Sequence, residues 1–97
     1  MTDRPFEPDW TIRPGILLRR TMQEKGLYDT QLAERSGLTV MTVRNVLDGA
    51  NRIDEATAER LAAGTGTSAQ FWLNAQAQYD ADIRRGAKDV SKEHEHD

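Results

Sequence analysis

The segment that decides the fold is residues 29–48, which read DTQLAERSGLTVMTVRNVLD. Its apolar residues recur at the three-to-four spacing of helices, which predicts a short helix on each side of Gly37. Glycine suits the turn because it tolerates a positive φ. A small residue at Ala33 lets the second helix cross close to the first, and Val43 supplies an aliphatic contact between them. An ordinary helical hairpin and a helix-turn-helix, whose second helix can lie in the DNA major groove, both have this spacing. The helices predicted before and after the segment favour the helix-turn-helix.

Further helices are predicted on both sides of this segment. Pro14 suits a first helical turn, because its missing N–H would be unpaired there, and Gly26 is typical of a helix end. Three polar residues are expected to cap later helices, namely Thr39, Asp54 and Ser68. The predicted helices cover residues 14–25, 29–36, 40–48, 55 to about 64 and 69 to about 85. Five short helices and no credible strand predict an all-α fold.

The two ends of the chain differ in composition from this helical domain, which spans residues 14–85. Residues 1–13 contain two prolines and no apolar period, so they are predicted to form an extended arm anchored by Phe6, Trp10 and Ile12. Residues 86–97 are charged and polar, which predicts a disordered tail.

Composition excludes several classes of protein. With 97 residues the chain suits one small domain, and without cysteine it has no disulfide, thiolate zinc site or catalytic thiol. No catalytic set of acid, base and nucleophile is apparent, so neither enzymatic activity nor a cofactor is expected. His94 and His96 are predicted to be solvated, and no metal site is expected. The absence of a membrane span or signal peptide makes the cytoplasm the expected location.

The net charge of −3 comes from 13 basic and 16 acidic residues, and it argues weakly against nucleic-acid binding. The distribution of charge matters more than the sum. Residues 39–53, the presumed DNA-facing segment, contain Arg44 and Arg52 against Asp48 alone. Much of the acidity lies instead in the tail and near residues 54–59, where a basic protein partner could bind.

Several stretches of the chain match one pattern: RPGILL at 13–18, QLAERSG at 31–37 and, most specifically, GTSAQFWLNAQ at 66–76. With these motifs the sequence resembles the HigA-type antitoxins, also called VapI or plasmid-maintenance antidote proteins. They belong to the XRE, lambda-repressor-like helix-turn-helix group. The resemblance covers about residues 8–82. It implies a five-helix domain that represses its own operon as a dimer and neutralises a RelE-like toxin ribonuclease.

The second helix of the motif carries the predicted DNA contacts. They are Thr39, Val40, Met41, Thr42, Arg44 and Asn45, with Arg52 as a phosphate contact beyond the helix. Arginine and asparagine have the chemistry for guanine and adenine edges respectively.

Three positions depart from the family pattern. Relatives often carry Gln at position 29, whereas Asp29 would repel a phosphate. Val40 and Met41 replace the Arg and Gln of relatives; they could contact thymine methyl groups or form an apolar patch that no longer reads bases. Two alternatives therefore stay open: a toxin-neutralising interaction module that binds DNA weakly, and a stand-alone XRE-family regulator.

A dimer seam is predicted on the last helix, residues 68–85. Neighbouring helical residues point about 100° apart, so Phe71 and Trp72 can face different surroundings. We assign Phe71 to the core, and Trp72, Leu73 and Tyr79 to the dimer interface. The alternative places both adjacent aromatic rings in the core of one chain.

Overall fold

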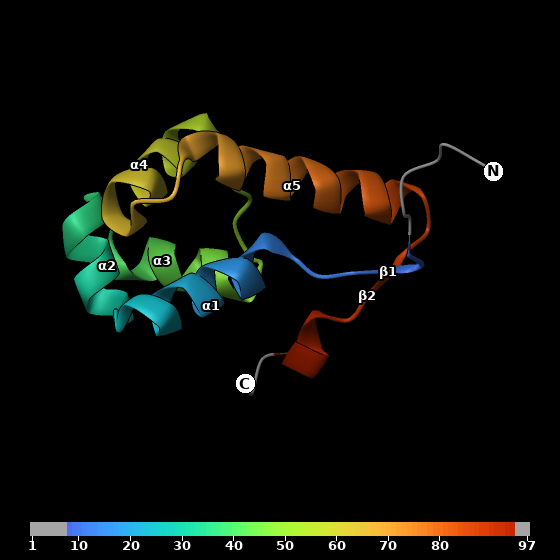
Figure 1. The fold of residues 1–97 in the computed structure, drawn as a ribbon, viewed down its shortest axis with the longest axis horizontal. Coiled ribbons are helices and arrows are strands. Elements are labelled where there is room, and N and C mark those ends of the chain that lie inside the picture. Colours follow the sequence, from blue (N-terminus) through green and yellow to red (C-terminus); the bar gives the residue numbers. More distant parts are fainter. Residues whose placement is uncertain (1–7, 95–97) are drawn as a thin grey trace.

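The computed structural model describes residues 8–94; residues 1–7, with Phe6, and residues 95–97, with His96, lie outside the described part. Its helices are α1 (Pro14–Lys25), α2 (Asp29–Ser36), α3 (Val40–Asp48), α4 (Glu55–Thr65) and α5 (Ala69–Arg84). Two-residue strands β1 (Trp10–Thr11) and β2 (Lys88–Asp89) pair in parallel, and a short 3₁₀ helix, η1 (Ser91–His94), follows. Figure 1 shows α1 to α4 gathered at one end of the molecule, with the long α5 reaching toward the strand pair. The five predicted helices are confirmed.

The polar residues expected at the starts of three helices do cap them. The backbone N–H of Thr42 donates to Thr39 Oγ1 at 3.0 Å, and that of Thr57 donates to Asp54 Oδ1 at 2.8 Å. Ser68 does the same for α5, at 3.1 Å. Gly37 ends α2 at a φ of 75°, the left-handed conformation that the turn of the motif requires. The two helices on either side of Gly37 therefore begin and end where the sequence predicts.

The core lies between the helices and contains one large ring. The Trp72 side chain is 0% exposed and packs with aliphatic residues of α1 to α4, whereas Phe71 is 42% exposed. The prediction that Phe71 fills the core and Trp72 faces a partner is therefore wrong. Trp72 lies on the side of α5 that packs against α4, whose Ala58 and Leu61 belong to the same buried cluster.

The arm and the tail hold each other. The Lys88 N–H donates to the Asp9 carbonyl at 2.8 Å, and the Val90 N–H donates to the Thr11 carbonyl at 2.9 Å. Buried Ser91 accepts the Arg13 N–H at 2.8 Å. Residues 86–94 are thus ordered and form a strand, whereas the sequence predicted a disordered tail and no strand. Periodicity could not reveal this order, because backbone pairing and a buried hydroxyl leave no apolar pattern in the sequence.

In the described part of the arm, residues 8–13, the buried side chain is a polar one. Thr11 is buried, and its hydroxyl donates to Asp82 Oδ2 at 2.9 Å. Trp10 is about half exposed and Ile12 is partly buried. Over residues 8–94, no helix combines the length and apolar character needed to cross a membrane.

Candidate nucleic-acid interface

Helix α3 has one side buried against the core and the opposite side exposed to solvent. Val43, Val46 and Leu47 are buried against the core. The outer side carries Met41, which is 65% exposed, and the exposed Arg44. The remaining predicted contacts on this helix are exposed at Thr39 and partly buried at Val40, Thr42 and Asn45. The structure thus gathers the six residues on the first turns of α3, the part of a recognition helix that faces base edges.

Two threonines order the N-terminal end of this surface. Thr39 Oγ1 accepts the Thr42 N–H and donates its own proton to Thr42 Oγ1 at 2.9 Å. Thr42 Oγ1 acts as the acceptor in that bond, so its own proton can go to an acceptor outside the chain. Thr42 is therefore prepared to donate to a base or phosphate oxygen.

Arg44 and Asp29 form an ion pair. Arg44 Nε donates to Asp29 Oδ2 at 2.7 Å, and the Arg44 and Asp29 side chains are 58% and 28% exposed. Asp29 Oδ1 accepts the Thr30 N–H at 2.7 Å. The hydrogen bond from Arg44 holds the pKa of Asp29 below its ordinary value, although desolvation opposes this effect. The sequence predicts that Arg44 contacts a base and that Asp29 repels a phosphate, as two separate effects. In the structure the two side chains are bonded to each other.

Arg52 is also paired. Its Nη1 donates to Asp80 Oδ1 at 2.8 Å and its Nη2 donates to Oδ2, which links the loop after α3 to α5. The bond to Asp80 raises the pKa of Arg52, and the same bond lowers the pKa of Asp80. A DNA phosphate that approaches Arg52 must therefore share this guanidinium with a carboxylate.

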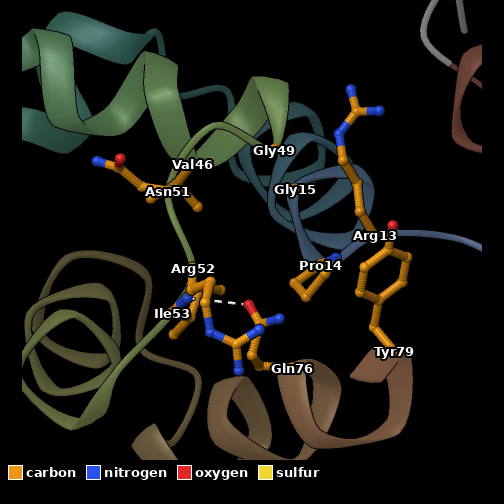
Figure 2. Close-up of a pocket in the computed structure, with 10 residues that line it drawn as sticks. All are labelled: Arg13, Pro14, Gly15, Val46, Gly49, Asn51, Arg52, Ile53, Gln76 and Tyr79. Carbon is orange, nitrogen blue, oxygen red and sulfur yellow. Dashed lines mark hydrogen bonds between the residues drawn. The ribbon is translucent and has the colours of Figure 1, made fainter. Parts of the chain in front are cut away.

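The same loop is held a second time, beside a small cavity. Gln76 Oε1 accepts the Ile53 N–H at 2.9 Å, drawn as the dashed line in Figure 2, and Gln76 Nε2 donates to Asp80 Oδ1 at 3.1 Å. The cavity, of about 230 Å³, lies between the start of α1, this loop and α5. Its ten lining residues include arginine, glutamine and tyrosine but no carboxylate, histidine or serine.

Arg13 supports the other end of α3. Its Nε donates to the Leu47 carbonyl at 3.2 Å, where α3 runs out of intrahelical partners. Gly15 brings the start of α1 against the same turn: a Cβ on Gly15 would lie 2.5 Å from the carbonyl oxygens of Val46 and Leu47. The C-terminal end of the predicted recognition helix is thus positioned by the start of α1.

The three residues predicted at the dimer interface differ in how far they are buried in their own chain. Trp72 is enclosed by its own chain, so its assignment to the interface is wrong. Leu73 is partly buried and packs on the core. Tyr79 is partly buried, and its hydroxyl donates to Asp89 Oδ2 at 2.6 Å. Burial, reinforced by that bond, raises the pKa of Tyr79 to about 12. A role for Leu73 and Tyr79 between two chains stays a prediction.

Sequence reasoning missed Asp80 and the joint role of Asp29. The partners are 28 residues apart for Arg52 with Asp80 and 15 apart for Arg44 with Asp29. The one local signal is the i,i+4 spacing of Gln76 and Asp80, which indicates a shared face of α5. That spacing does not show which loop crosses this face.

No protein-family model matches the sequence, and no curated protein is similar to it. Solved structures are similar. An addiction module antidote protein of the HigA family from Coxiella burnetii is 35% identical, with a TM-score of 0.68, over 76% of this chain and 82% of that chain. Antitoxin HigA of Pseudomonas aeruginosa, solved with the higBA promoter, is 29% identical, with a TM-score of 0.70, over 97% and 95%.

The protein PA4674 of Pseudomonas aeruginosa, in complex with 18 base pairs of its operator DNA, is 30% identical. Its TM-score is 0.70, and the match covers 95% of this chain and 94% of that chain. The relatives thus match both the helix-turn-helix and the helices that support it, over most of each chain. The chain belongs to the HigA family of addiction-module antidote proteins.

Proposed function

We propose that this chain is the antitoxin of a type II toxin–antitoxin pair, which binds operator DNA as a homodimer and represses its own operon. The observation that carries this proposal is the solvent-exposed side of α3, a helix that packs against α2 and is joined to it through the turn at Gly37. Two of the similar structures contain promoter or operator DNA. Their likeness supports the use of the same surface here.

In this proposal α3 enters the major groove with its first two turns. Asn45 can pair with an adenine edge, and Arg44 with guanine O6 and N7. Val40 and Met41 can contact thymine methyl groups, while Thr42 donates a hydrogen bond. Arg52 contacts a phosphate by sharing its guanidinium with Asp80.

A gel shift with the duplex upstream of the gene that encodes the chain tests the recognition helix. Arg44→Ala and Asn45→Ala are each expected to weaken specific binding roughly 10- to 100-fold, the contribution of a bidentate base contact. Lys88→Ala is the matched control, because it removes an exposed cation from β2, away from α3 in Figure 1. Unchanged affinity in both α3 variants would contradict the assignment of α3.

The homodimer is required by the DNA geometry of the proposal. Two recognition helices reach successive major grooves when they lie about 34 Å apart. The exposed side of α5, with Leu73 and Tyr79 at its border, is the proposed seam. Light scattering of the free chain and of its DNA complex is expected to give two chains per operator. A duplex cut to one half-site should bind much more weakly, and equal binding to both duplexes would contradict the dimer.

The proposed protein partner is a RelE-like toxin ribonuclease. The start of α4 exposes Glu55 and Glu59 beside Asp54, a surface that complements a basic protein. Co-expression with the product of the adjacent small gene should yield a copurifying complex and restore growth. Glu55→Lys with Glu59→Lys is expected to weaken that complex but to leave the gel shift in place. Failure to copurify would contradict this part of the proposal.

A second candidate function is a toxin-neutralising module that binds DNA poorly. It is favoured by the two ion pairs that occupy Arg44 and Arg52, and by the apolar Val40 and Met41. This candidate predicts copurification with the toxin and no gel shift up to high micromolar concentrations. A specific shift at nanomolar concentrations would exclude it.

A further inference from the structure

We infer that Asp29 is a positioning residue for DNA reading: it holds the Arg44 guanidinium by Nε, so that the Nη1–Nη2 edge is presented to a base rather than to a phosphate. This inference rests on the proposed DNA-binding function and concerns how that site discriminates between sequences. It gives a purpose to an acidic residue that otherwise counts against DNA binding.

The geometry supports a fixed orientation. The Asp29 carboxylate is held at the first turn of α2, where the Thr30 N–H donates to Oδ1 at 2.7 Å and Oδ2 accepts from Arg44 at 2.7 Å. A carboxylate in a first helical turn is also stabilised by the helix dipole. The anchor of Arg44 is therefore a carboxylate that is itself hydrogen-bonded to the backbone at the start of α2.

The chemistry of the guanidinium decides what remains for DNA. Arginine has five N–H donors in one plane, one on Nε and two on each Nη. Within residues 8–94, the bond to Asp29 is the one hydrogen bond made by the Arg44 side chain. The four Nη protons are thus left for a ligand with two acceptors. Guanine presents such a pair, O6 and N7, in the major groove.

The charge of Asp29 disfavours the competing ligand. A phosphate beside Arg44 would also lie beside the Asp29 carboxylate, and like charges repel. Guanine carries no net charge, so it is spared most of this repulsion. Arg44 bound to Asp29 should therefore contribute little to sequence-independent binding. Its main contribution should be to discrimination between DNA sequences.

Asp29→Asn tests this inference with little change of shape. Binding of this variant to the upstream duplex and to a base-shuffled duplex of equal length and composition is measured over a range of salt concentrations. The variant is expected to bind the shuffled duplex more tightly and to lose several-fold of its discrimination. The slope of log affinity against log salt should become steeper by about one, because Arg44 is no longer neutralised.

Matched variants separate positioning from a general effect of charge. Glu34→Gln makes the same charge change on an exposed residue of α2, and it should tighten binding to both duplexes without altering their ratio. Arg44→Lys keeps the charge but loses the planar fork, so it should lose discrimination as Asp29→Asn does. In an Arg44→Ala background, Asp29→Asn should no longer change the ratio.

The outcomes distinguish this inference from the function on which it rests. If the unchanged chain prefers its upstream duplex and Asp29→Asn keeps that preference in full, the inference is overturned and the proposed function stands. An equal change in the ratio for Glu34→Gln would overturn it in the same way. If the unchanged chain shows no preference for either duplex, the proposed function fails, and the inference fails with it.

Discussion

The Asp80 carboxylate on α5 accepts hydrogen bonds from both terminal nitrogens of Arg52, a residue in the loop that follows α3. A residue predicted to touch DNA is thereby tied to the helix that supports the fold. Gln76 binds the same carboxylate and the same loop, so the three side chains form one network. The position of the loop and the ionisation of Asp80 are consequently coupled.

The first prediction concerns acid stability. Because Arg52 lowers the pKa of Asp80 in the folded chain, the pair stabilises the fold above the ordinary aspartate pKa of about 4. That stabilisation is lost as the pH falls through the lowered folded pKa. Asp80→Asn should therefore reduce the melting temperature at pH 7 and flatten its fall below pH about 4. Thermal melts monitored by circular dichroism across this range measure the effect.

Asp48→Asn is the control for that experiment. Asp48 is exposed at the end of α3 and makes no ion pair among residues 8–94. Its replacement should leave the pH dependence of the melting temperature close to that of the unchanged chain. The same flattening in both variants would show that general charge, and not the Arg52 pair, is responsible.

Helix positions could be predicted from the sequence because their signals are local. The caps at Thr39, Asp54 and Ser68 and the turn at Gly37 each act within a few residues, and all are observed. What could not be predicted depends on distant segments. Periodicity separates Phe71 from Trp72 but does not state which of the two meets α4. Likewise, the tail is ordered through Ser91 and the arm, from the other end of the chain.

The second prediction contrasts the two adjacent rings. Trp72 is fully buried, so Trp72→Ala should lower the free energy of unfolding by about 3–5 kcal/mol. Phe71 is 42% exposed and touches Trp72 edge-on, with ring centroids 4.9 Å apart. Phe71→Ala should therefore cost less than Trp72→Ala, about 1–3 kcal/mol from the partial burial and the edge-on ring contact together. Urea unfolding monitored by circular dichroism distinguishes them, and similar losses would contradict the burial that the structure assigns.

A further variant tests the indole nitrogen. Trp72 Nε1 is buried and has no hydrogen-bond partner among the described residues. Trp72→Phe loses packing but also removes this unpaired donor, which is costly to bury. Its unfolding free energy should therefore lie much closer to that of the unchanged chain than to that of Trp72→Ala.

The third prediction concerns the approach of α1 to α3. A methyl group at Gly15 would meet two backbone carbonyl oxygens at 2.5 Å, so Gly15→Ala should cost about 1–3 kcal/mol of unfolding free energy. At Gly64 the nearest atom to an added methyl is the movable end of Leu32, at 2.7 Å, followed by Ser36 Cβ at 3.0 Å. Gly64→Ala should therefore cost less. Urea unfolding of both variants provides the comparison, and the opposite order would contradict the close approach of α1.

The last prediction uses the bond between Tyr79 and Asp89. Burial and this bond raise the pKa of Tyr79 to about 12 in the folded chain, above the ordinary value of about 10. Because burial and the bond both favour the protonated hydroxyl, Tyr79 contributes its full stability below pH about 10. The fold loses this contribution as the pH rises from about 10 toward 12. Ultraviolet absorbance of tyrosinate should show a late ionisation that Tyr79→Phe removes and Asp89→Asn moves to lower pH. A titration that is the same in the unchanged chain and in Asp89→Asn would show that Asp89 does not hold Tyr79. The tail would then lose one of the contacts that tie it to α5.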